Sequence, residues 1–143
     1  MIQMIFINLP VTDLNRAIAF YEAIGATRNM FCEEGTAIGM TFSDAIHVML
    51  LTHEKFSEFT TRPIAGRDTV ETLLCLSCDS RAAVDAMVTR AAGAGGAPDP
   101  TPTQEFGFMY GRSFEDPDGH IWEVMWMDPA GFKAAASGEP AVA

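Results

Sequence analysis

The spacing of hydrophobic residues divides the first half of the chain into five predicted elements. Residues 3–9 form a strand-like run that ends at Pro10. Asp13 stands where a helix N-cap belongs, and apolar residues follow it with helical spacing at Leu14, Ala17, Ile18 and Tyr21. Gly25 is placed to close this helix. Three strands are then predicted over residues 26–31, 36–42 and 46–52, so the order is β-α-β-β-β.

The second half repeats this order. A strand is predicted over residues 69–77, and Asp79 or Ser80 can cap a helix with the apolar face Val84, Met87, Val88 and Ala91. A glycine-rich stretch that begins at Gly93 ends this helix. Residues 97–107 are rich in Pro and Thr, so any strand there is expected to be short or irregular. A hairpin of residues 108–115 and 120–127 completes the repeat.

The repeat predicts an α+β fold of two tandem βαβββ units. The units cover about residues 1–52 and 69–128, and a linker over residues 53–68 contains a short helix near residues 53–59. One helix covers one face of each sheet. The two sheets are therefore expected to form a cupped mixed sheet around a shared cavity, with the helices on the outer face. We expect one domain over residues 1–132 and a disordered tail over residues 133–143.

Composition narrows the classes of partner. The chain has 143 residues, 48% of them hydrophobic, and a formal net charge of −10. No basic stripe is visible, so neither nucleic acid nor a membrane is an expected partner. There is no long apolar run and no signal-peptide pattern, and the three cysteines are an odd number. The expectation is a cytoplasmic protein.

The most informative segment is Asp116-Pro117-Asp118-Gly119-His120-Ile121-Trp122-Glu123-Val124. Pro117 and Gly119 suit the two corners of a turn, and Glu123 is a carboxylate inside an apolar strand. Together with Leu9-Pro10-Val11-Thr12-Asp13-Leu14, Ala19-Phe20-Tyr21 and Gly25, this segment resembles the vicinal oxygen chelate superfamily. That superfamily contains lactoylglutathione lyases, bleomycin- and fosfomycin-resistance proteins and extradiol dioxygenases. One scaffold there carries several activities, so the resemblance specifies the fold better than the chemistry.

The resemblance implies a metal site whose His, Gln and Glu ligands come from the first and fourth strands of each unit. Glu123 matches one ligand position. The other three positions fall on Phe6, on Leu73 and near Met49, and all three side chains are apolar. One carboxylate is too few ligands to hold a metal against water. No cofactor is therefore predicted, and a divalent metal remains the alternative.

Glu123 is the candidate catalytic residue, as a general base or as an anchor for a polar ligand. Alternatively, Glu123 is a remnant of an ancestral site, and a neighbouring donor hydrogen-bonds its carboxylate. A four-residue turn would place Arg112 opposite Glu123. A turn with Gly119 in a bulge would instead place Gly111 and Ser113 on the Glu123 face, and the resemblance favours this register.

Other residues of suggestive type have ordinary explanations. His47 shares a strand face with Met49 and is expected at the cavity rim, although a satisfied or solvent-facing histidine is the more common case. His120 adjoins the turn and is interpreted as structural. Cys75 and Cys78 form a C-x-x-C string, but in a strand these two thiols face opposite sides. Cys75 shares its parity with Leu73 and is a candidate pocket residue.

The favoured hypothesis is a protein that binds a small, largely apolar molecule, without a metal, in the cavity between the βαβββ units. The predicted ligand-binding residues are Phe6, Asn8, His47, Met49, Leu73, Cys75, Ser113 and Met125. One alternative is a metal-dependent lyase or isomerase of the lactoylglutathione lyase type. The other is a non-catalytic interaction module, because short sheets with exposed edges favour pairing in a homodimer.

Overall fold

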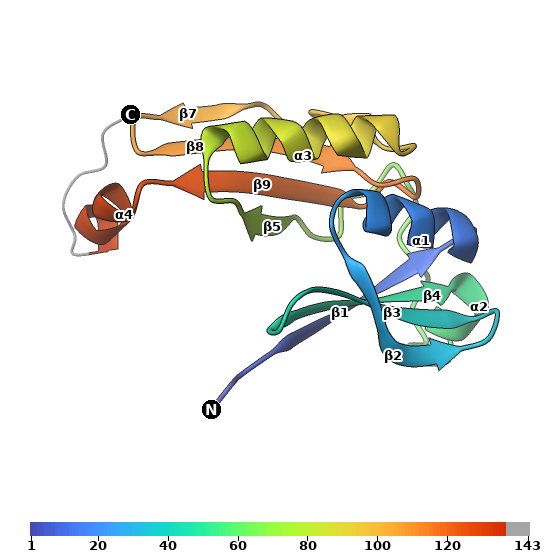
Figure 1. The fold of residues 1–143 in the computed structure, drawn as a ribbon. Helices are drawn as coiled ribbons and strands as arrows, with labels where there is room; N and C mark the ends of the chain where they lie inside the picture. Colours follow the sequence, from blue (N-terminus) through green and yellow to red (C-terminus); the bar gives the residue numbers. More distant parts are fainter. Residues whose placement is uncertain (137–143) are drawn as a thin grey trace. The chain divides into compact units, whose positions relative to one another are not determined.

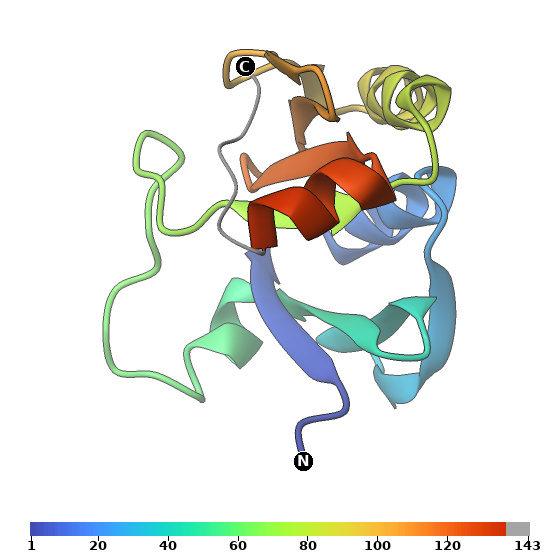
Figure 2. The same cartoon turned by 90° about the vertical axis from the view of Figure 1, so that its left-hand side faces the viewer.

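The computed structural model describes residues 1–136, except the side chains of Met30, Phe132 and residues 134–136. The chain divides into two compact units (Figures 1 and 2). Unit 1 contains Met1–Glu71 together with the turn Pro117–His120. Unit 2 begins at Thr72, runs to Asp116 and resumes at Ile121.

Unit 1 is a four-stranded sheet with one long helix. Its elements are β1 (Ile5–Val11), α1 (Leu14–Ala23), β2 (Thr27–Glu33), β3 (Ala37–Ser43), β4 (Ile46–Thr52) and the short α2 (His53–Phe56). The sheet order is β1-β4-β3-β2. β1 runs parallel to β4, and the other neighbours are antiparallel. The mixed sheet predicted from the first half is therefore present.

Helix α1 begins and ends where the sequence pattern predicts. The Asp13 side chain accepts a hydrogen bond from the Arg16 backbone N–H at 3.1 Å, and Gly25 follows the helix with φ of +112°. Phe20 and Tyr21 are fully buried, and the Tyr21 ring meets Phe42 of β3 edge to face. This contact fixes the sheet face that α1 covers. The core on that face contains Met40, Val48 and Leu50.

Unit 2 repeats the plan with weaker edge strands. Its elements are β5 (Leu74–Ser77), α3 (Arg81–Gly93), β6 (Ala97–Pro98), β7 (Gln104–Phe106), β8 (Met109–Glu115), β9 (Ile121–Met127) and α4 (Pro129–Ala136). The order is β5-β9-β8-β6, and β7 also pairs with β8. Ser80 caps α3, whose length packs along β8 and β9 (Figure 1). The tandem βαβββ fold expected from the sequence is confirmed.

The boundary of one predicted strand is wrong. The strand expected over residues 69–77 is only Leu74–Ser77, because Thr69 closes a turn by donating its N–H to the Gly66 carbonyl oxygen at 3.0 Å. Figure 2 shows this connection (green) running without helix or strand from α2 toward β5. The tail expected to be disordered starts at residue 133, and its residues 133–136 form the last part of helix α4. The rest of that tail, residues 137–143, lies outside the described residues.

The turn between β8 and β9 packs in unit 1. Asp118 has a side chain only 5% exposed, and its Oδ1 accepts from the Thr12 backbone N–H at 2.9 Å and from the Thr12 hydroxyl at 2.8 Å. The Arg16 guanidinium lies 3.7 Å from the same oxygen. His120 Nε2 lies 2.7 Å from the Pro10 carbonyl oxygen. These bonds explain the turn sequence and agree with a structural role for His120.

Asp118→Ala is expected to lower the free energy of unfolding by about 1–3 kcal/mol, because it leaves two Thr12 donors without their acceptor. The measurement is urea unfolding followed by circular dichroism. Glu71→Ala is the matched control, since Glu71 is exposed and makes no ion pair or side-chain hydrogen bond within the described residues. Equal stability of the two variants would contradict the assigned role of Asp118.

Candidate functional site

The sheet face of unit 1 opposite α1 carries four of the eight candidate ligand residues. Strand pairing aligns Phe6 of β1 with His47 of β4, and Asn8 with Met49. It also aligns Gly39 of β3 with Met49. Side chains alternate along a strand, so these residues share one face while Met40, Val48 and Leu50 point to the α1 side. The predicted grouping of Phe6, Asn8, His47 and Met49 on one face is correct.

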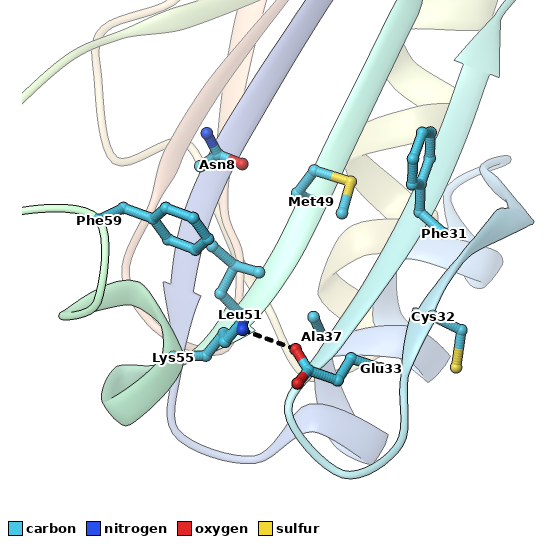
Figure 3. A pocket seen from close by; sticks show the side chains of 9 residues that line it. All are labelled: Asn8, Phe31, Cys32, Glu33, Ala37, Met49, Leu51, Lys55 and Phe59. Atoms are coloured by element: carbon cyan, nitrogen blue, oxygen red, sulfur yellow. Dashed lines mark ion pairs between the residues drawn. The ribbon is translucent and has the colours of Figure 1, made fainter.

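A pocket of about 260 Å³ lies on this face. Its lining comes from all four strands, from α2 and from the segment after α2: Asn8, Phe31, Cys32, Glu33, Ala37, Met49, Leu51, Lys55 and Phe59. Figure 3 shows Met49 between Phe31 on one side and Phe59 on the other, with Asn8 beside the strand β1. Most of the lining is apolar. This pocket is the candidate binding site.

The wall at Phe31 is built by a bulge in β2. Four residue steps of β2 from Arg28 to Cys32 oppose only two steps of β3. Inside the bulge, Asn29 Oδ1 accepts from the Phe31 backbone N–H at 2.9 Å, and Asn29 Nδ2 donates to the Thr41 hydroxyl at 3.1 Å. The amide lies over Gly39, where a Cβ would stand 2.1 Å from Asn29 Oδ1. Glycine at position 39 therefore makes room for the side chain that holds Phe31 in place.

The opposite end of the pocket is charged. Lys55 Nζ lies 2.7 Å from Glu33 Oε2 and 3.4 Å from Glu58 Oε1, and the first pair is drawn in Figure 3. The hydrogen bond from Lys55 lowers the pKa of Glu33, and the same bond raises the pKa of Lys55. Thr52 caps the short helix that carries Lys55, through a hydrogen bond from the Lys55 N–H. The ammonium group is therefore already compensated by two carboxylates.

Phe6 and His47 lie beside the pocket and are not among its lining residues. Their rings stack with centroids 4.8 Å apart, and Phe6 also meets Phe31 edge to face at 6.4 Å. The Thr41 hydroxyl lies 2.9 Å from His47 Nδ1, and His47 Nε2 lies 3.1 Å from the Asp44 carbonyl oxygen. The tautomer with its proton on Nε2 satisfies both bonds. This histidine is a satisfied one, as its sequence context favours.

The face of unit 2 opposite α3 carries the remaining candidates. Glu123 of β9 pairs with Ser113 of β8 and with Cys75 of β5. Arg112 lies on the α3 face, where its guanidinium binds Asp99 at 2.7 Å and Asp85 at 3.0 Å. The register that places Ser113 on the Glu123 face is therefore the correct one. Glu123 makes no hydrogen bond or ion pair with any other described residue.

A second, small pocket of about 40 Å³ lies on this face. Cys75, Glu123 and Met125 line it, among other residues. Ser113 is buried, and its Oγ bonds the Thr101 backbone N–H at 3.1 Å and the Thr101 hydroxyl at 2.7 Å. Leu73 precedes β5, is 47% exposed and lines neither pocket. The structure thus divides the predicted ligand residues between the two units.

The residues at the implied metal-ligand positions do not fit a metal. Phe6 and Leu73 have no donor atom, and the thioether of Met49 is a poor ligand for the hard cations that accompany carboxylates. Among residues 1–136, no three His, Cys, Asp or Glu side chains are grouped so as to hold an ion. Glu123 therefore has no partner ligands for such a site within the described chain.

The profile of the Glyoxalase/Bleomycin resistance protein/Dioxygenase superfamily matches residues 3–124. The chain belongs to this superfamily. No protein with a curated description matches the chain. In the part of the chain that the structure describes, no helix is long and apolar enough to cross a membrane.

Solved structures of other proteins share the fold. The hypothetical protein SA1046 from S. aureus is 26% identical with a TM-score of 0.74, over 88% of this chain and 95% of that one. The fosfomycin resistance protein FosX from Mesorhizobium loti is 16% identical with a TM-score of 0.65, over 92% and 97%. The lactoylglutathione lyase from Agrobacterium tumefaciens is 20% identical with a TM-score of 0.58, over 86% and 92%.

Of the nine residues that line the unit 1 pocket, the sequence predicted only Asn8 and Met49. Phe31 depends on a bulge, Phe59 lies in a segment interpreted as linker, and Glu33 and Lys55 meet only in the folded chain. Two signals were available. An Asn inside a predicted strand favours local irregularity, and two phenylalanines at positions 56 and 59 are unusual for a solvated linker.

Cys75 is expected to be a slow nucleophile near neutral pH. Burial raises the pKa of its thiol, and the negative charge of Glu123 and the neighbouring Cys78 raise it further. Only the thiolate reacts, so alkylation of Cys75 by iodoacetamide should accelerate at a higher pH than an ordinary thiol requires. Peptide mass spectrometry of samples alkylated between about pH 7 and pH 10 measures this.

Glu123→Gln removes one of the negative charges that raise the pKa of Cys75. The pH profile of Cys75 alkylation should therefore move toward lower pH. Glu71→Gln provides the control, since its exposed carboxylate is in unit 1 and is not among the groups that act on Cys75. An unchanged profile in Glu123→Gln would show that this carboxylate does not act on the thiol.

Proposed function

We propose that this protein binds a small, largely apolar molecule in the unit 1 pocket and needs no metal to do so. The observation that carries the proposal is the pocket itself: about 260 Å³ on a sheet face that the unit's own helix does not cover. Small-molecule sites are typically concave and mostly apolar, with a few polar groups that orient the ligand. This pocket has that composition.

The apolar part of the pocket supplies the driving force. Ala37, Met49 and Leu51 project from adjacent strands and form a continuous floor. Covering such a surface releases about 25 cal/mol for each Å² of apolar area removed from water. Methionine adapts to ligands of different outline because its side chain is unbranched and polarizable. A ligand of modest size can therefore bind without a charged anchor.

The polar groups at the pocket supply orientation. The Asn8 amide offers both a donor and an acceptor. Lys55 and Glu33 bind each other at 2.7 Å, so together they present little net charge to a ligand. This arrangement favours a ligand that is mainly apolar and has one hydrogen-bonding group.

The metal-dependent lyase alternative has less support. Its chemistry uses a metal to stabilise an enediolate, and the ligand positions here are Phe6, Leu73 and a site near Met49. A catalytic or anchoring role for Glu123 stays a prediction, as do the homodimer and the cytoplasmic location. Relatives named for resistance or lyase activity support a small molecule as the partner, but they are too distant to identify it.

Met49→Trp should abolish ligand binding, because the indole would fill the space above the pocket floor. The measurement is saturation-transfer NMR with a panel of apolar fragments in buffer that contains EDTA. Val70→Trp is the matched control, since Val70 is exposed in unit 1 and does not line the pocket.

Fragments that bind the native protein and Val70→Trp but not Met49→Trp would support the proposal. Binding that persists in Met49→Trp would place the site elsewhere. Binding that disappears on addition of EDTA would contradict metal independence.

A further inference from the structure

Two phenylalanine rings flank the unit 1 pocket and remain largely exposed. Phe31 is 54% exposed and Phe59 is 70% exposed, although both line a pocket with an apolar floor. Figure 3 shows the two rings on opposite sides of Met49. Exposed aromatic rings are costly in water, and rings that face the same concavity are typical of a site completed by its ligand.

Each ring has one side-chain contact among the described residues. Phe31 meets Phe6 edge to face at 6.4 Å, and Phe59 has the Lys55 ammonium 5.7 Å from its centroid. The bonds from Asn29 to the Phe31 backbone and to Thr41 fix the backbone that carries the first ring, and the edge contact with Phe6 restrains the ring itself. A prepositioned aromatic wall loses little side-chain entropy on binding.

The hydrogen-bonding capacity of the pocket is concentrated in Asn8. Its side chain lines the pocket and makes no hydrogen bond with another described residue. A primary amide presents one acceptor and two donors side by side. Another amide satisfies both kinds of group at once, whereas a simple hydrocarbon satisfies neither.

The local charge is unfavourable for an anionic ligand. Lys55 is the one cationic side chain that lines the pocket, and Glu33 and Glu58 lie 2.7 and 3.4 Å from its Nζ. The three groups sum to a negative charge, and the whole chain has a net charge of −10. A carboxylate ligand would have to displace Glu33 from Lys55 and would meet a second carboxylate at Glu58.

We infer that the ligand class of this pocket is an uncharged, planar aromatic molecule with an amide-like group, which packs between Phe31 and Phe59 and hydrogen-bonds Asn8. The inference rests on the proposed function, because it specifies the ligand of the same pocket. Phe31 and Phe59 discriminate aromatic from aliphatic ligands, and Asn8 selects the amide. The compensated Lys55 leaves anions without a binding partner.

Three probes of matched outline test this inference by isothermal titration calorimetry. They are naphthalene-2-carboxamide, its saturated analogue decahydronaphthalene-2-carboxamide, and the anion naphthalene-2-carboxylate. The aromatic carboxamide is expected to bind about threefold to tenfold more tightly than the saturated one, because ring–ring contacts add to the burial of area. It should exceed the carboxylate by at least about threefold at low salt, and this difference should shrink as salt rises.

Substitutions test which residue is responsible for each of these differences in affinity. Phe31→Leu and Phe59→Leu should each reduce the preference for the aromatic over the saturated probe, while the saturated probe keeps its affinity within about twofold. Asn8→Leu should weaken both carboxamides more than the carboxylate, because only a carboxamide can also donate to the Asn8 carbonyl oxygen. Phe106→Leu is the control, because Phe106 is 37% exposed on β7 of unit 2 and lines neither pocket.

The outcomes separate the two proposals. If both carboxamides bind equally and Met49→Trp abolishes both, the proposed function stands and the aromatic class is wrong. If the carboxylate binds best, the inferred neutrality of the ligand is wrong. If no probe binds with a Kd below about 1 mM while apolar fragments still bind at Met49, the aromatic inference is wrong and the proposed function stands. If neither probes nor fragments bind, both proposals fail.

Discussion

A single helix covers only one face of each sheet, and both candidate pockets lie on the faces that remain. In unit 1, α1 packs over Met40, Val48 and Leu50, and the alternation of side chains then directs Asn8 and Met49 to the other side. In unit 2 the same rule directs Cys75, Ser113 and Glu123 away from α3. The helical face requires tight apolar packing, whereas the opposite face can accept polar groups and open space. The location of the sites is thus a consequence of how the core is made.

The uncovered sheet faces of the two units differ in how much open space they contain and in which side chains lie on them. The unit 1 face has a pocket of about 260 Å³, a bulged strand and exposed rings, while the unit 2 face has only about 40 Å³ beside Glu123. In unit 1 two polar side chains near the floor are engaged, His47 by Thr41 and Asp44, and Lys55 by Glu33, whereas Asn8 makes no such bond within the described residues. Bonds of this kind restrain the side chains that make them. Ser113 is likewise occupied by Thr101, so Glu123 stands among groups that do not bind it.

The sequence predicted what depends on short-range order. Asp13 and Ser80 cap their helices, Gly25 closes the first one, and the turn with Gly119 sets Ser113 opposite Glu123. These features follow from local residue spacing, so they could be predicted without knowledge of the fold. The walls of the pocket could not be predicted in this way. Phe31 owes its position to a bulge in β2, and that bulge depends on the absence of a side chain at Gly39, eight residues after Phe31. Leu73 likewise lies outside β5, because β5 pairs with β9 only from Leu74 to Ser77.

The packing of the β8–β9 turn in unit 1 bears on how this chain can be divided. Unit 1 includes Pro117–His120, although those four residues are flanked on both sides by strands of unit 2. A fragment cut after Glu71 would lack Asp118, so the Thr12 N–H and hydroxyl would lose their acceptor at the start of α1. The apparent tandem repeat is therefore not a pair of interchangeable modules.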